Sequence, residues 1–123
     1  MFGIDISKEN DYYVIKPEIQ GADEGDAFYI HESATEEIQR QIEENEVSEE
    51  FYVRAGLKSG EQGVQFFLEF DNNVSESDVS FTAGETKFTV NSNTLFYLSG
   101  MNLSYKEPSD EEAGGFALEK IRN

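Results

Sequence analysis

The amino-acid sequence predicts a single β-rich α+β domain with antiparallel or mixed sheet, one main helix and one short helix. A length of 123 residues suits one domain. From Phe51 onwards, apolar residues alternate with a period of two, as in strands that bury one face. Between residues 33 and 45, apolar residues instead recur every four positions, as on one side of a helix.

Residues 1–29 are predicted to form an N-terminal extension with short strands, and residues 30–123 the main domain. The run Tyr12–Lys16 is aromatic and β-branched, and Pro17 is expected to end it because proline lacks a backbone donor. A second run covers residues 27–30. The two runs can pair as a hairpin, which we expect to lean on the main domain because an isolated hairpin is marginally stable.

The main helix is predicted to span residues 33–45. Ser33 and Glu36 have the spacing of a capping box, in which each side chain bonds the other residue's amide. Ala34, Ile38 and Ile42 form a narrow apolar stripe, which predicts that this side is buried. The rest of the helix is expected to face water with Glu36, Glu37, Gln39, Arg40, Gln41, Glu43 and Glu44.

Strands are predicted over residues 51–57 and 64–70, joined by a turn that contains Gly60 and Gly63. The second of these should bury a face made of Val64, Phe66, Leu68 and Phe70. Residues 79–81 and 86–90 are typical of a hairpin around Gly84. A short helix capped by Asn91 or Ser92 follows, then strands over residues 101–105 and 116–118.

Composition excludes several classes of function. With 26 acidic and 9 basic residues the net charge is −17, which argues against binding nucleic acid or an anionic membrane. The absence of cysteine excludes thiolate metal sites, cysteine-held clusters and cysteine nucleophiles. No apolar run is long enough to span a membrane and the N-terminus lacks a signal-peptide pattern, so we expect a soluble, cytoplasmic protein.

No catalytic constellation emerges from the sequence, so the protein is not expected to be an enzyme. His31 is the single histidine and is interpreted as a strand-end or capping residue. Ser59 has no neighbouring base and no nucleophile elbow. The acidic run Glu43, Glu44, Glu46, Glu49 and Glu50 is typical of a solvated helix end and turn.

An ordered set of motifs nevertheless resembles a known family. After the predicted helix come Ser59-Gly60-Glu61-Gln62-Gly63 and an aromatic strand that ends in Leu68-Glu69-Phe70. Further along are Asp78 before the hairpin, a helix with Leu95, Leu98 and Gly100, and the pair Gly115-Phe116. From residue 30 to about residue 119, the sequence resembles the HesB/IscA-like family, the A-type iron–sulfur cluster carriers. The resemblance implies that family's fold.

Two departures bear on the activity that the resemblance implies. Glu61 stands where the family has its first cysteine, and the family's C-terminal Cys-Gly-Cys segment has no counterpart in residues 118–123. We therefore expect no bound cluster and no other cofactor. Glu61 offers a hard oxygen ligand, whereas iron–sulfur chemistry prefers soft thiolate.

Two functions remain open at this stage. One is a non-catalytic adaptor or binding module related to iron–sulfur cluster assembly, whose acidic surface would attract a basic protein through Glu43, Glu44, Glu46 and Glu49. The alternative is labile iron or another hard metal bound through carboxylates that include Glu61. The acidity alone is also consistent with a role in solubility. The oligomeric state is left open.

Overall fold

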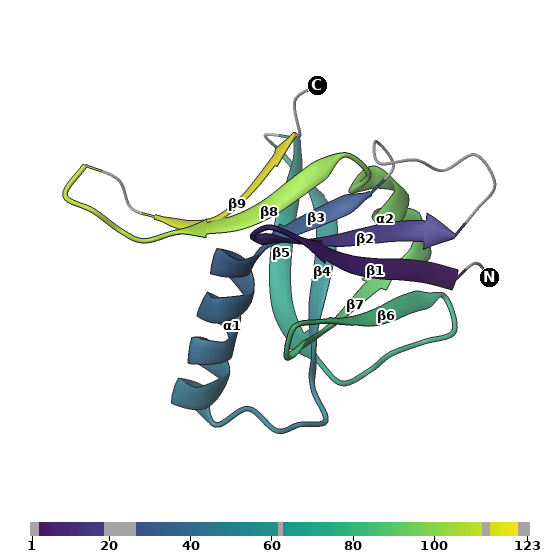
Figure 1. Ribbon diagram of the computed structural model, residues 1–123, viewed down its shortest axis with the longest axis horizontal. Helices are drawn as coiled ribbons and strands as arrows, with labels where there is room; N and C mark the ends of the chain where they lie inside the picture. The colour runs from purple at the N-terminus through teal and green to yellow at the C-terminus, as the bar shows by residue number, and fades with distance from the viewer. Residues whose placement is uncertain (1–2, 19–26, 62, 112–113, 121–123) are drawn as a thin grey trace.

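A computed structural model describes residues 3–18, 27–61, 63–111 and 114–120 of the chain (Figure 1). It confirms the predicted α+β class, with strands predominating over one long and one short helix. The elements in chain order are β1 (Gly3–Glu9), β2 (Tyr12–Glu18), β3 (Phe28–His31), α1 (Glu32–Asn45), β4 (Tyr52–Gly60), β5 (Gly63–Asp71), β6 (Asp78–Ala83), β7 (Thr86–Asn91), α2 (Ser92–Tyr97), β8 (Met101–Lys106) and β9 (Gly115–Lys120).

One sheet has five strands in the order β1-β2-β3-β8-β9. Its neighbours are antiparallel except for the parallel pair β3 and β8. The two predicted N-terminal strands do pair, with Tyr12 opposite His31. The division at residues 29 and 30 stays a prediction, but β1 and β2 share this sheet with β8 and β9.

Two features of this sheet differ from the sequence prediction. The strand β1 was not predicted, because only Ile4 and Ile6 give it an apolar pattern. In addition, β2 continues through Pro17 to Glu18 instead of ending before the proline. The β2–β3 register ends at Ile15, so among the described strands only β1 pairs with β2 at Pro17, and proline is tolerated at such an edge position.

The second sheet has four strands in the order β5-β4-β7-β6. Two antiparallel hairpins, β4–β5 and β6–β7, meet through the parallel pair β4 and β7. The predicted hairpin around Gly84 is confirmed, with that glycine at a φ of 64°. The rings of Phe81 and Phe88 stack at 5.4 Å between centroids. The buried core draws residues from both sheets and both helices, including Ile15, Phe28, Ile38, Val53, Phe88, Leu95 and Leu103.

The helix α1 confirms the predicted apolar stripe and the interpretation of His31 as a strand-end or capping residue, but not the predicted capping box. Ala34 and Ile38 are buried and Ile42 is partly buried against the core. The N-cap is His31, whose Nδ1 accepts the Ser33 amide at 3.0 Å. Ser33 lies inside the helix, where its Oγ accepts the Tyr105 amide at 3.1 Å. The predicted capping box is therefore wrong, because β3 runs directly into α1 and its last residue takes the cap position.

Glu37 also differs from its predicted place in solvent. Its side chain is 8% exposed and accepts hydrogen bonds from Arg40 and Gln41. The shorter helix α2 is capped by Asn91, one of the two predicted capping residues. In the described part of the chain, neither helix combines the length and apolarity that a membrane crossing demands.

Candidate functional site

Glu61 lies at the tip of the β4–β5 hairpin, between the end of β4 at Gly60 and the start of β5 at Gly63. Its side chain is exposed. Among the residues that the structure describes, no three histidine, aspartate or glutamate side chains are grouped so that they could hold a metal ion. A metal at Glu61 therefore stays a prediction, and its other ligands are not supplied by the described neighbours.

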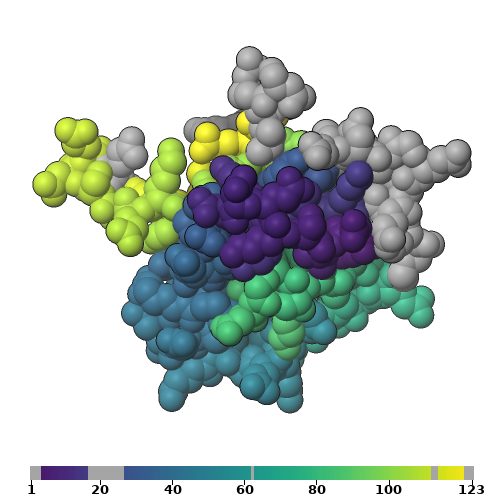
Figure 2. All heavy atoms as spheres, viewed as in Figure 1, coloured from purple at the N-terminus to yellow at the C-terminus, as the bar shows by residue number. Residues whose placement is uncertain are grey.

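The predicted acidic surface occupies the last turn of α1 and the loop that follows. Glu43, Glu44, Glu46 and Glu49 are all exposed, so this part of the chain is open to a partner. In the space-filling view, α1 and its following loop form the lower left of the face shown (Figure 2). Glu44 is paired with Arg40 at 2.6 Å. The Lys87 ammonium donates to the backbone carbonyl of Glu49, which ties the loop to β7.

The strand β5 is the least covered strand of the second sheet. None of its residues is buried, and Val64 and Phe70 are 68% and 36% exposed. The predicted buried face is therefore only partly formed: Phe66 and Leu68 pack against the core, whereas Val64 and Phe70 face solvent. The reason is topological, since β5 is an edge strand with β4 on one side and no described strand on the other.

A groove of about 310 Å³ runs along this free edge, and we call it the edge groove. It is lined by residues 66–70 of β5, by Ile38 and Gln41 of α1, by Val53 of β4 and by Phe116 of β9. The groove thus lies between α1 and β5, which is the outermost described strand of its sheet. Figure 1 shows α1 and β5 side by side below β8 and β9.

A second hollow of about 480 Å³ continues from the edge groove. The two share Val53 and Phe70 in their walls. The second is lined further by Ile42, Val47 and Phe51, which are apolar, and by Glu49 and Glu85. The acidic surface predicted from the sequence thus reaches the apolar groove at Glu49. Glu49 and Glu85 form an acidic rim there, and Lys87 lines the same hollow.

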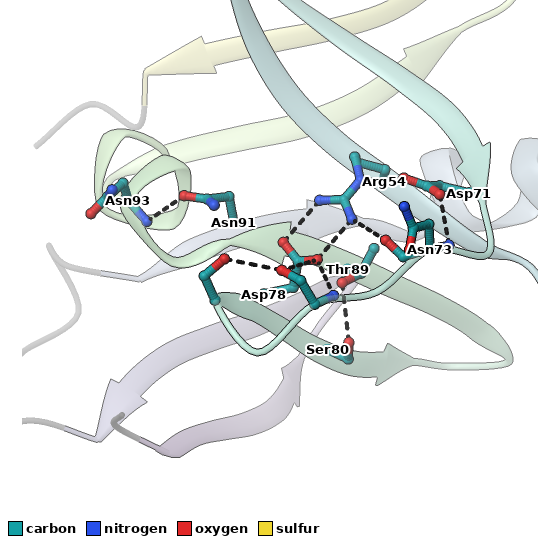
Figure 3. A network of polar contacts seen from close by, with 10 residues as sticks. Arg54, Asp71, Asn73, Asp78, Ser80, Thr89, Asn91 and Asn93 are labelled. Carbon is teal, nitrogen blue, oxygen red and sulfur yellow. Dashed lines mark hydrogen bonds and ion pairs between the residues drawn. The ribbon is translucent and has the colours of Figure 1, made fainter.

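An ion-pair network fixes the other end of β4 and β5 (Figure 3). Arg54 of β4 bonds Asp71 at the end of β5 at 2.6 Å and the carboxylate of Asp78 at the start of β6 at 2.8 and 3.0 Å. The Asp78 carboxylate also accepts the Ser75 amide. Hydrogen bonding to Arg54 lowers the pKa of Asp78 to about 2, and Arg54 likewise lowers the pKa of Asp71. All partners are satisfied, so we assign this network a structural role.

Sequence reasoning missed the edge groove because it assumed a covered strand. One signal was present, since Phe66, Phe67 and Leu68 are consecutive and place apolar side chains on both faces of β5. Phe67 covers Gly56 of β4, where an added Cβ would lie 2.4 Å from its ring. A strand that is apolar on both faces either lies inside a sheet covered on both sides or lies at an edge with apolar surface left open. The order of strands in the sheet decides between these two cases.

Comparison with known proteins identifies relatives. No model of a protein family matches the chain. It is 31% identical over 96 residues to the iron–sulfur cluster insertion protein ErpA of Francisella philomiragia, a match that covers 76% of this chain and 78% of the relative. The proteins of the same name from Francisella tularensis subspecies novicida and subspecies tularensis match with the same identity and coverage. This identity and coverage show that the chain belongs to the HesB/IscA family of iron–sulfur cluster proteins.

Proposed function

We propose that this protein is a non-catalytic adaptor in iron–sulfur cluster assembly. The observation that carries the proposal is a contrast within the β4–β5 hairpin. Its tip has Glu61 in place of a thiolate ligand, and its outer strand exposes the apolar side chains of Val64 and Phe70 beside the edge groove. A chain of this family without cysteine lacks the ligands for a thiolate-bound cluster. A surface for binding other proteins is what its fold still offers.

Charge supports a basic partner. With a net charge of −17, the chain should accelerate its encounter with a positively charged protein and slow its encounter with an acidic one. Glu43, Glu44, Glu46 and Glu49 are exposed, and Glu49 lines the continuation of the edge groove; these four are the proposed steering residues. Nucleic acid and anionic membranes are not proposed as partners, because the same charge would repel them.

The first test is reconstitution with ferrous iron and sulfide under anaerobic conditions. The expected result is a colourless protein without stoichiometric sulfide after desalting, because no thiolate is available. A visible charge-transfer absorption with matching iron and sulfide contents would contradict the proposal. A cluster-binding relative from the same family, treated in parallel, shows that the reconstitution conditions work.

The second test is capture of partners by the tagged chain, with the double variant Glu43→Lys and Glu44→Lys as comparison. We expect the wild-type chain to capture proteins that make or receive iron–sulfur clusters, and the variant to associate more slowly with the same purified partner. A captured set without any such protein would contradict the proposal. Association rates measured from about 0.05 to about 0.5 M salt should fall, because the Debye length shortens from about 14 Å to about 4 Å.

The alternative function, binding of labile iron through carboxylates, keeps one supporting observation: Glu61 is exposed at the family's first ligand position. It is tested by titrating ferrous iron without sulfide into the wild-type chain and the Glu61→Gln variant. Glu76→Gln, in the exposed loop before β6, is the matched control. Iron binding that Glu61→Gln alone removes would favour this function over the adaptor.

A further inference from the structure

The free edge of β5 differs from the other strand edges of the molecule. Solvent-facing edges are normally protected from pairing by lysine, proline, polar side chains or bulges. The edge strands β1 and β9 carry Lys8 and Lys120, and β6 exposes Ser80 and Thr82. The strand β5 pairs with β4 over nine consecutive positions without a bulge and has no lysine or proline. It exposes Gln65 and Glu69, but unlike β6 it also exposes large apolar side chains, those of Val64 and Phe70. Among the described strands, β5 is therefore the edge best suited to accept another strand.

The edge groove gives this edge a side-chain recognition surface. An added strand next to β5 would place alternate side chains on the two faces of the enlarged sheet. On one face they would meet Ile38 of α1, Phe66, Leu68 and Phe116 of β9, which form the apolar wall. Backbone hydrogen bonds to β5 would supply affinity, and this wall would select apolar residues at alternate positions, as in other cases of strand addition.

Charge then decides between a second copy of this chain and a different partner. Glu69 is exposed on β5 itself, and Glu49 and Glu85 line the continuation of the groove beside a single lysine, Lys87. Two copies joined through β5 would bring these carboxylates together in molecules that each carry −17 charges. An added strand with lysine or arginine between its apolar residues would instead neutralise them.

We propose that β5 binds, by strand addition, an extended segment of another protein in which basic residues alternate with apolar ones. The inference rests on the proposed adaptor function and names the chemistry of its partner. It requires an exposed segment about as long as β5, which has nine residues. The apolar side chains fill the edge groove and the basic side chains approach Glu69 and the acidic rim.

The test uses a synthetic nine-residue peptide in which lysine alternates with leucine and valine, matched in length to β5. One control peptide has the same composition with its lysines in one block. A second has N-methyl groups on alternate backbone nitrogens, which removes strand pairing and keeps the side chains. Binding is measured by fluorescence anisotropy, and hydrogen–deuterium exchange reports which amides become protected.

We expect the alternating peptide to bind about tenfold more tightly than either control and to protect amides of residues 64–70. Phe70→Asp should weaken binding by about tenfold or more, because Phe70 lines the groove and is already 36% exposed. Tyr97→Asp on α2 is the matched control, since Tyr97 is 75% exposed and lies outside the groove. Leu68→Ala serves as a second groove variant, and circular dichroism checks that each variant is folded.

Two outcomes would overturn the inference. Equal binding of all three peptides, or binding of none, would show that no strand is added at β5. Self-association of the wild-type chain that Phe70→Asp abolishes would show that a second copy covers the edge. Neither outcome bears on the adaptor function, which fails separately if a cluster is reconstituted or if captured proteins are unrelated to cluster assembly.

Discussion

The two hairpins of the four-stranded sheet are built alike but are buried very differently. In the hairpin β6–β7, Phe81, Phe88 and Val90 are all buried. In the hairpin β4–β5, no residue of β5 is buried, although that strand is richer in phenylalanine than either β6 or β7. The strand β7 lies between β4 and β6 and packs against both helices, whereas β5 has only β4 beside it.

This difference separates stability from recognition within one sheet. Burial of large apolar side chains stabilises the fold, so β6–β7 is expected to carry much of the stability of the sheet. The same side chains on an open edge contribute less to folding and leave apolar surface for a partner. Substitutions can therefore separate residues that stabilise the fold from residues that are available to a partner.

The largest expected effect is on the buried hairpin. Phe88→Ala should lower the free energy of unfolding by about 3–5 kcal/mol, because it removes a fully buried ring and leaves a cavity. Phe70→Ala on β5 should cost less than about 1.5 kcal/mol, because that ring is partly in water already. Urea denaturation at neutral pH measures both. Equal losses would mean that Phe70 is covered in solution, and the contrast between the hairpins would fail.

The next prediction concerns Ile38, which belongs to the core and also lines the edge groove. Ile38→Ala should destabilise the protein by about 2–4 kcal/mol, since the side chain is 3% exposed. Ile42→Ala, one turn later and only partly buried, should cost less. Urea denaturation of the two variants gives the comparison. If Ile38→Ala lowered the free energy of unfolding less than Ile42→Ala, Ile42 would be the more deeply buried residue, and α1 would be rotated relative to the groove.

A third prediction is a pH dependence of the network that links the two hairpins through Arg54, Asp71 and Asp78. The folded-state pKa of Asp78 is lowered to about 2, below the unfolded value of about 4. Its stabilising contribution is therefore fully present above pH 4 and is lost as pH falls toward 2. We expect that contribution to be up to about 2 kcal/mol.

The measurement is the free energy of unfolding from pH 7 to pH 2 for the wild-type chain and for Asp78→Asn. The difference between the two should shrink as the pH falls, because protonation removes the same charge that the substitution removes. Asp110→Asn, in an exposed loop, is the control for general titration of this acidic chain. A wild-type advantage that stays constant down to pH 2 would show that the Asp78 charge is not what Arg54 stabilises.

The smallest effect separates two neighbouring glutamates of α1. Glu37→Gln should lower the melting temperature measurably, because hydrogen bonds from Arg40 and Gln41 hold that carboxylate and lower its pKa. Glu36→Gln should leave it unchanged, since Glu36 is exposed. The loss for Glu37→Gln should diminish in acid, as the pH falls below the ordinary glutamate pKa and through the lowered pKa of folded Glu37, because protonation then removes the charge. Identical melting temperatures for the wild-type chain and Glu37→Gln would contradict this, and would indicate that the Glu37 side chain faces solvent, as the sequence predicts.

Much of the fold could be predicted from local pattern. The helix stripe of Ala34, Ile38 and Ile42, the hairpin around Gly84 and the short helix capped by Asn91 depend on residues close in sequence. The strand β1 was missed because it has few apolar residues, and its extended conformation depends on pairing with β2. The interpretation of His31 as a strand-end or capping residue is confirmed, whereas the capping box at Ser33 was wrong because the end of β3 depends on its long-range pairing with β2 and β8.

The candidate site divides in the same way. The sequence by itself determined that this chain has no cysteine thiolate to hold a cluster and that its net charge is −17, because both follow from composition. The basic partner that this charge favours stays a prediction. Only the tertiary structure decided that the aromatic strand β5 is an edge and that Ile38 and Phe116 close a groove beside it. Alternation shows which residues share a face of a strand, but whether that face is covered depends on elements distant in sequence.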